Sequence, residues 1–341
     1  MVLTPQHIQE GILRGTAAVQ RRAMAKAITL LESTRDDHRA QADQLLTALL
    51  PHTGNAVRLA ISGVPGVGKS TFIESLGTYL TQQGHKVAVL AIDPSSTLSG
   101  GAILGDKTRM EQLSVNPQAY IRPSPSSGTL GGVAEKTREA MLVCEAAGYD
   151  VVLVETVDVG QSEIAAHGMT DMFCLLQLPN AGDDLQAIKK GVMERADLVV
   201  INKADLDLNA ATRAQAQITS SLRLLSLHGR SAVEQGGVQQ VWQPQVLPMS
   251  ALKAEGIEQF WHCVQRFVQL QQDTGGWAAR REQQALDWMW ERIESGLRHA
   301  FRHDPKVQAQ LPQLQAQVVQ GAVAASTAAR QLLALHRADK T

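Results

Sequence analysis

The chain has 341 residues, of which 44% are hydrophobic and 19% are charged, and its formal net charge is −1. This composition excludes a disordered chain, and a charge near zero disfavours nucleic acid or an anionic membrane as a partner bound through clustered Lys and Arg. We expect a soluble, cytoplasmic protein, because no apolar run approaches the roughly 20 residues of a membrane span and the first residues do not form a signal sequence.

Three segments follow one another along the chain. Apolar residues at helical spacing predict an N-terminal helical extension over residues 1–54. Residues 55–270 alternate short β-type runs with helical stretches, which predicts an α/β domain with a mostly parallel sheet and helices on both faces. Residues 271–341 are rich in Gln and Ala and predict a C-terminal helical arm. The predicted strands cover residues 57–62, 86–92, 151–154, 172–178, 198–201 and 246–249.

A glycine-rich stretch directly after the first predicted strand fits the phosphate-binding pattern GxxxxGK[ST]. It consists of Gly63, Val64, Pro65, Gly66, Val67, Gly68, Lys69, Ser70 and Thr71. The glycines allow backbone N–H groups to point inward, Lys69 reaches the outer phosphates, and the Ser70 hydroxyl can hold Mg²⁺ at the start of a helix. The stretch therefore predicts a P-loop that binds a nucleoside triphosphate.

A second motif selects the base. Asn202, Lys203, Ala204 and Asp205 follow the predicted strand over 198–201 and form the NKxD pattern. The Asp205 carboxylate can accept hydrogen bonds from guanine N1 and N2, whereas adenine lacks this donor pair. The triplet Ser250, Ala251 and Leu252 after the last predicted strand resembles the base-backing element of GTP-binding proteins. We therefore predict GTP and GDP as ligands.

Carboxylates in the glycine-rich segment from Asp93 to Met110, and Glu155 just after the strand over 151–154, are candidates for binding Mg²⁺. This ion prefers octahedral oxygen ligation and keeps several waters. Ser70, the terminal phosphates and one or two of Asp93, Asp106 and Glu155 would satisfy it.

Taken together, the motifs resemble one family, the cobalamin-associated GTPases typified by MeaB and ArgK and related to the methylmalonic aciduria type A protein. The resemblance rests on GVPGVGKST, DPSS followed by GGAILGDKTRM, RPSPSSGTLGGV, VETVDVGQSE, GDDLQAIKKGVMERADLVVINKAD and PMSAL, in this order. These blocks cover roughly residues 60 to 252.

The resemblance implies a homodimeric G protein that escorts an adenosylcobalamin-dependent acyl-CoA mutase, a separate polypeptide. GTP hydrolysis would gate cofactor loading and protect or rescue the mutase, whose adenosyltransferase is a further candidate partner. The intrinsic rate of hydrolysis would be low and raised by the partner. The terminal segment 271–341 would be the dimerisation arm.

The resemblance also assigns roles to single residues. Lys69, Ser70 and Thr71 would contact phosphate and Mg²⁺. Asp93 and Asp106 would lie in a first switch, while Glu155 would begin a second switch that Gln161 helps complete. Lys189 or Lys190, in a third switch, could stabilise charge on the transferred phosphoryl group. The catalytic candidates are Lys69, Asp106, Glu155, Lys189 and Lys190.

One position departs from the family pattern. The second switch usually reads ETVGVGQSE, and Asp158 replaces the first glycine here. Two unit charges about 4 Å apart interact by roughly 4 kcal/mol at an effective dielectric near 20, so this carboxylate would repel the terminal phosphate. The hypothesis is that the chain binds GDP but closes poorly on GTP. An Asp158 turned toward solvent is the alternative.

Three other functions remain open from the residues. A metal-insertion GTPase of the urease or hydrogenase accessory type would share the fold and the guanine motif, but it usually adds a Cys- and His-rich site. A small-molecule kinase would use the same P-loop without needing the NKxD motif. An interaction module with a vestigial nucleotide site would bind its partner regardless of nucleotide.

Overall fold

The structure is a computed structural model that describes residues 4–33, 35–92, 110–123, 130–156, 162–180, 190–229 and 242–337. The chain divides into two compact units, Met1–Trp277 and Ala278–Thr341. None of the helices in the described ranges has the length and apolar character of a membrane span.

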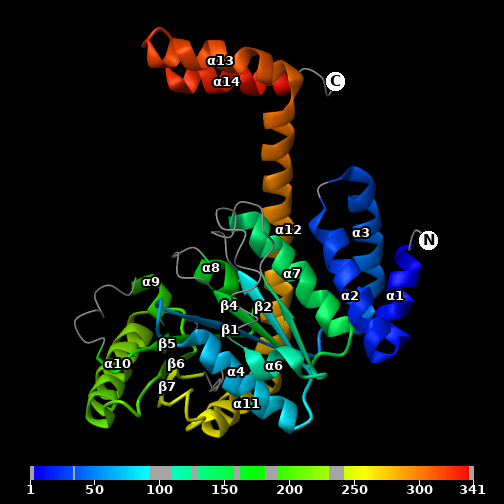
Figure 1. The fold of residues 1–341 in the computed structure, drawn as a ribbon. Helices are drawn as coiled ribbons and strands as arrows, with labels where there is room; N and C mark the ends of the chain where they lie inside the picture. Colours follow the sequence, from blue (N-terminus) through cyan, green and yellow to red (C-terminus); the bar gives the residue numbers. More distant parts are fainter. Residues whose placement is uncertain are drawn as a thin grey trace. The chain divides into compact units, whose positions relative to one another are not determined.

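A seven-stranded sheet lies at the centre of the first unit, in the order β3-β2-β4-β1-β5-β6-β7 (Figure 1). All neighbouring strands are parallel. Parallel sheets are covered on both faces, which explains the continuous apolar runs of the central strands. The strands are β1 (Val57–Gly63), β2 (Val87–Ile92), β3 (Ala119–Arg122), β4 (Val151–Thr156), β5 (Met172–Gln177), β6 (Leu198–Ile201) and β7 (Gln245–Pro248).

The predicted α/β fold is confirmed, and one strand was missed. β3 has four residues, lies at the edge of the sheet and is partly exposed at three positions. Its sequence, Ala-Tyr-Ile-Arg, lacks the continuous apolar run of the equally short β6, and its place in the sheet depends on its pairing with β2.

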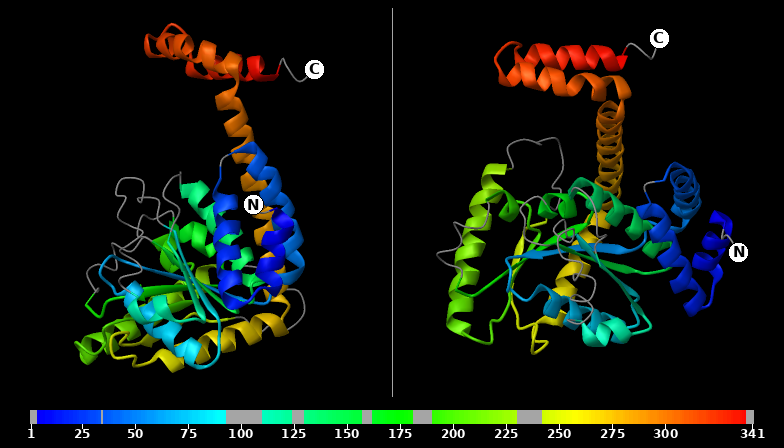
Figure 2. Two further views of the ribbon diagram at one scale, coloured as in Figure 1. Left: turned by 45° about the vertical axis from the view of Figure 1, so that its right-hand side comes forward. Right: turned by 45° about the horizontal axis from the view of Figure 1, so that its top comes forward.

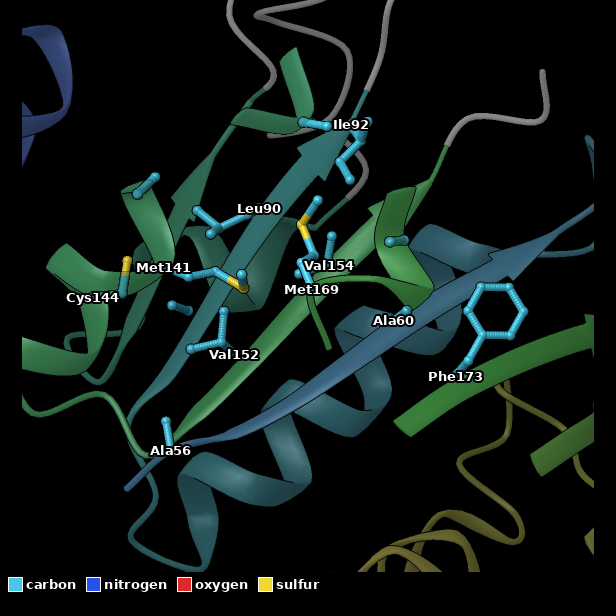
Figure 3. Packing of buried hydrophobic residues seen from close by; sticks show 14 of the residues in the cluster. Ala56, Ala60, Leu90, Ile92, Met141, Cys144, Val152, Val154, Met169 and Phe173 are labelled. Atoms are coloured by element: carbon cyan, nitrogen blue, oxygen red, sulfur yellow. The ribbon is translucent and has the colours of Figure 1, made fainter. Parts of the chain in front are cut away.

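Helices cover each face of the sheet around a separate apolar cluster. Alternate residues of one strand enter different clusters: Leu59 and Ile61 of β1 pack with α4 and α11, whereas Ala60 packs with α7. Figure 3 shows the cluster on the α7 face of the sheet, where Met141 and Cys144 of α7 lie near Val152 of β4. One face carries α4 (Lys69–Gln82), α6 (Glu111–Val115) and α11 (Ile257–Asp273); the other carries α7 (Leu130–Ala146), α8 (Ser162–His167), α9 (Lys190–Met193) and α10 (Leu208–Gly229).

The N-terminal helices extend the α7 side of the core. Met24, Ile28 and Leu31 of α2 are buried in the same cluster as α7, and α2 contacts α7 directly. Figures 1 and 2 show these helices beside α7. They are α1 (Pro5–Arg14), α2 (Ala17–Glu32), α3 (Asp36–Leu49) and the 3₁₀ turn η1 (Leu50–His52).

The second unit has its own small apolar core. It contains most of α12 (Gly276–His303), followed by α13 (Pro305–Val319) and α14 (Ala325–Arg337). Val307 and Leu314 of α13 pack with Ala328 and Leu332 of α14. Asp304 begins α13 by accepting hydrogen bonds from the N–H groups of Lys306 and Val307.

Candidate functional site

The glycine-rich stretch forms a tight loop between β1 and α4, and two of its glycines are required by close contacts. Gly63 has φ 149°, and a Cβ there would lie 2.6 Å from the Leu176 carbonyl oxygen. Gly68 has φ 97°, and a Cβ there would lie 2.7 Å from Asn202 Nδ2. Neither position accommodates a side chain without displacing the loop. The motif therefore folds as a strand, a loop and a helix that begins at Lys69.

Lys69 folds back over this loop. Its ammonium group donates a hydrogen bond to the Gly63 carbonyl oxygen at 2.5 Å. The next residue, Ser70, donates its hydroxyl to Glu155 Oε1 at 3.2 Å. Glu155 lies near the end of β4 and is 8% exposed. A cation, a hydroxyl and a carboxylate are thus grouped at the carboxyl edge of β1 and β4, where ligands of parallel α/β sheets bind.

Asn202 connects the P-loop to the loop after β7. Its Nδ2 donates to the Val67 carbonyl oxygen at 2.8 Å, and its Oδ1 accepts from the Ala251 N–H at 3.0 Å. The side chain is 2% exposed, so both ends of a buried amide are satisfied by backbone groups. The two motifs predicted separately from the sequence are therefore joined by one side chain.

Lys203 and Asp205 face the same region. Lys203 adopts φ 61°, uncommon for a residue other than glycine, and its ammonium group donates to the Gly66 carbonyl oxygen at 2.8 Å. The Ser250 hydroxyl and the Lys253 ammonium group, 3.5 Å from Asp205 Oδ2, lower the pKa of the Asp205 carboxyl. Asp205 is therefore ionised at neutral pH and able to accept two hydrogen bonds.

A cavity of about 290 Å³ lies between these motifs. It is lined by Gly68, Thr71, Asn202, Lys203, Asp205, Leu206, Ser250, Ala251 and Leu252. Thus the P-loop, the NKxD motif and the predicted base-backing triplet, which lie far apart in sequence, enclose one space. Two members of the triplet, Ser250 and Ala251, are almost fully buried, while Leu252 is 82% exposed.

The structure brings together only some of the predicted residues. Lys69, Ser70 and Glu155 are adjacent, as described above. Lys190 is the first residue of α9, and its side chain is not among those described. The remaining switch candidates, Asp93, Asp106, Asp158, Gln161 and Lys189, lie outside the described residues.

Two residues of the cavity region were missed in the sequence. Lys253 reaches Asp205 although 48 positions separate them, and Leu206 lines the cavity beside it. The only available signal was adjacency: each directly follows a recognised motif. Adjacency does not say where a side chain points, so the pairing of Lys253 with Asp205 required the tertiary structure.

Comparison with known proteins decides which nucleotide-binding family this site represents. The family described as "Methylmalonyl Co-A mutase-associated GTPase MeaB" matches residues 24–306. The chain belongs to the MeaB family. It is accordingly a GTPase that binds GTP and GDP and hydrolyses GTP.

Curated relatives support this assignment over most of the chain. A probable GTPase of Mycobacterium tuberculosis is 49% identical over 95% of this chain and 94% of its own length. The GTPase ArgK of Escherichia coli is 48% identical, covering 84% of each chain. The mitochondrial methylmalonic aciduria type A homolog of Mus musculus is 44% identical over 96% of this chain and 79% of its own length.

The fold agrees with a solved relative. The crystal structure of an LAO/AO transport system kinase superposes with a TM-score of 0.71 at 35% identity, covering 98% of this chain and 96% of the other. The family resemblance inferred from the motifs is therefore confirmed.

Proposed function

We propose that this MeaB-family GTPase is a chaperone of an adenosylcobalamin-dependent acyl-CoA mutase, a separate polypeptide. In this proposal GTP hydrolysis gates cofactor loading and protects or reactivates the mutase, with its adenosyltransferase as a further partner. The observation that carries the proposal is the match to a family described as associated with methylmalonyl-CoA mutase, over residues 24–306. The nucleotide-dependent part rests on the cavity between the P-loop and the NKxD motif.

In the proposed site, the loop from Gly63 to Gly68 surrounds the phosphates. Lys69, which now bonds the Gly63 carbonyl, would exchange that bond for the more strongly accepting outer phosphate oxygens. Thr71 and Ser70 would complete the phosphate contacts at the start of α4. Positioning and charge stabilisation supply most of the catalysis in phosphoryl transfer, so this loop and its lysine are the first catalytic candidates.

The base would occupy the cavity beside Asp205. Both oxygens of its carboxylate can accept from guanine N1 and N2, and Asn202 and Lys203 hold the surrounding backbone through Val67 and Gly66. Ala251 and Leu252 would lie against the base. This arrangement supports a guanine site over an adenine site, and therefore GTP hydrolysis over a kinase reaction with ATP.

The donor set also fits Mg²⁺. The Ser70 hydroxyl and the Glu155 carboxylate are hydrogen-bonded to each other, and both are oxygen ligands of the type that Mg²⁺ prefers. Asp93 and Asp106 are further candidates from the sequence. When bound, Mg²⁺ would neutralise developing charge on the phosphate oxygens. Ser70 and Glu155 would then orient that end of the nucleotide.

We also propose a homodimer and a division of the chain into three parts. Residues 1–54 form an N-terminal extension, residues 55–270 form the GTPase domain and residues 271–341 form a dimerisation arm. Support for the arm comes from α12, where Leu286, Trp290, Ile293 and Leu297 are each 41–59% exposed at spacings of four, three and four residues. This spacing is typical of a seam between two helices. A second copy of this chain would cover it.

The first experiment titrates the purified protein with GDP, a non-hydrolysable GTP analogue and ATP, then follows GTP turnover with and without a candidate mutase. Guanine-selective binding together with turnover raised by the mutase is the expected result. If the protein binds guanine nucleotides but its affinity for the mutase is the same with and without nucleotide, the result would instead support an interaction module. Preferential use of ATP would contradict the proposal.

The role of Asp158 can be tested by a single substitution. We propose that its carboxylate repels the terminal phosphate, so that the chain binds GDP well and closes poorly on GTP. Asp158→Gly should then raise the GTP hydrolysis rate by about ten-fold or more, since about 1.4 kcal/mol corresponds to ten-fold. The change in GDP affinity should be small. Equal hydrolysis rates for the two forms would show that Asp158 faces solvent.

A further inference from the structure

The short helix α6 is bound at its amino end by the helix that follows the P-loop. Glu74 of α4 accepts hydrogen bonds from the backbone N–H groups of Gln112 at 2.7 Å and Leu113 at 3.3 Å. A carboxylate at this end satisfies N–H groups that have no partner within the helix and complements the helix dipole. Glu74 therefore attaches α6 to α4.

The turn that follows α6, beginning at its C-cap residue Asn116, is bound by helix α2. Arg21 of α2 directs Nη2 at three carbonyl oxygens between the end of α6 and the start of β3, those of Asn116 at 2.8 Å, Pro117 at 3.0 Å and Ala119 at 2.6 Å. A guanidinium group at this end complements the opposite pole of the helix. A second contact from α2 joins Glu32 to Arg122 at the end of β3, 2.6 Å apart.

Packing between α4 and α6 leaves little freedom. Gly77 of α4 faces Leu113, whose Cδ2 would lie 2.6 Å from a Cβ at position 77. Leu113 is 1% exposed. Asn116 also donates its side-chain amide to Thr81 Oγ1 of α4 at 3.0 Å. Because close-packed contacts transmit displacement, a shift of α6 is passed to α4.

On the α4 side, this connection ends one helical turn from the P-loop residue Ser70. Glu74 lies four residues after Ser70, one turn further along the same face of α4. Met110, which is 1% exposed, directly precedes α6 and joins it to the segment that carries Asp106. The position of α6 therefore affects α4 through side-chain contacts. It also affects Met110, because Met110 is covalently joined to the first residue of α6.

We propose that Arg21 is a positioning residue for GTP hydrolysis. It links the placement of the N-terminal helices to α6, and through Glu74 to the helix that carries Lys69 and Ser70. A protein partner that moves α2 would change the hydrolysis rate without touching the nucleotide. This inference depends only on the GTPase activity of the chain and not on the identity of the proposed mutase partner.

The test compares Arg21→Met, which keeps the length of the side chain but removes its donors, with Arg21→Lys, which keeps the charge. Couplings of this kind change rates by about three- to ten-fold. Arg21→Met should lower kcat for GTP by this factor, while KM and GDP affinity stay within about two-fold. Arg21→Lys should restore part of the loss. The matched control, Arg22→Met on an exposed position of α2, should leave kcat unchanged.

A second substitution separates this role from a purely structural one. Glu74→Gln weakens the other attachment of α6, so the kcat loss of the double variant with Arg21→Met should be smaller than the product of the single losses. An Arg21→Met protein with a lower melting temperature but unchanged kcat would overturn the proposal. So would multiplicative losses in the double variant. If Arg21→Met fails to fold, Arg21→Gln takes its place, and an unchanged kcat in that variant would overturn the proposal equally.

Discussion

At the scale of single residues, the site depends on side chains that contact two separate parts of the chain. Asn202 holds the P-loop at Val67 and the base-backing loop at Ala251, and its Nδ2 would lie only 2.7 Å from a Cβ at position 68. The same contact thus explains why position 68 requires glycine and why position 202 requires a short amide. Asp205 is held by Ser250 and Lys253 in its charged form.

Base selectivity should follow the chemistry of Asp205. Asp205→Asn replaces one acceptor by a donor, so the side chain should accept from N1–H and donate to the carbonyl that xanthine carries at position 2. We expect GTP affinity to fall about 100-fold or more and the preference to shift toward the xanthosine nucleotide. Binding titrations with both nucleotides measure this.

The matched control is Asp207→Asn, which alters a carboxylate two residues away. Asp207 caps α10 through the Ala210 N–H at 2.8 Å and does not line the cavity. Its replacement should leave nucleotide preference unchanged, because Asn also caps helices. A shift in preference with both variants would argue against a specific role for Asp205.

At the scale of elements, the close approach of α4 and α6 depends on Gly77. Glycine inside a helix normally costs about 0.5–1 kcal/mol relative to alanine. At Gly77 the clash with buried Leu113 should outweigh this gain, so Gly77→Ala should destabilise the protein by about 1–3 kcal/mol. Urea denaturation measures the change in the free energy of unfolding.

Gly296 of α12, unlike Gly77, has space for a side chain. A Cβ there would meet no atom within 4 Å. Gly296→Ala should therefore stabilise the helix by about 0.5–1 kcal/mol. Equal stabilisation by both alanine variants would contradict the tight packing of α6 on α4.

The α13 and α14 hairpin should lose stability in acid. A hydrogen bond from His336, with Nδ1 2.6 Å from Oδ2, together with the helix-capping N–H groups lowers the pKa of Asp304 below its ordinary value of 3.8. A lowered folded-state pKa means that this contribution is present above pH 3.8 and is lost as the pH falls through the folded-state value. Hydrogen exchange of the α13 amides should therefore accelerate relative to its intrinsic rate in this range.

Asp304→Asn separates the two contributions of this side chain. Asparagine keeps the N-cap but has no titrating carboxylate, so the variant should lose the acid-dependent change in protection. Asp287→Asn, at an exposed position of α12, is the control and should retain that change. An unchanged pH profile in Asp304→Asn would assign the acid sensitivity to other groups.

At the scale of the whole molecule, the exposed seam of α12 predicts the oligomeric state. Trp290 is 59% exposed in the middle of the seam. A charge at this position would be buried against a second copy, so Trp290→Asp should convert a dimer into a monomer. Light scattering should give twice the chain mass of 36.8 kDa for the natural protein and the single mass for the variant.

Ser295→Asp is the matched control, because it adds the same charge on the opposite side of α12. It should leave the dimer intact. A monomeric natural protein, or equal dissociation of both variants, would remove the seam as a dimer interface.

The sequence alone determined the fold class, the P-loop and the guanine motif. The fold class follows from the alternation of strands and helices along the chain, and the two motifs are short continuous runs: β1 and the loop that follows it lie within residues 57–71, and the NKxD motif directly follows β6. Local backbone preferences and hydrogen-bond chemistry act over such distances, so the residues themselves carry the signal. The switch residues Asp93, Asp106, Asp158, Gln161 and Lys189 remain predictions from sequence.

The tertiary structure decided how these parts meet. The bonds from Asn202 to Val67 and from Arg21 to Ala119 cross 135 and 98 positions, and Ser70 reaches Glu155 across 85. The pairing of the edge strand β3 with β2 and the ion pair between Lys253 and Asp205 are also contacts between residues that are far apart in sequence. Such contacts depend on strand order and on where each side chain points after folding. No local pattern encodes them, because the chain between the partners sets their distance only through the complete fold.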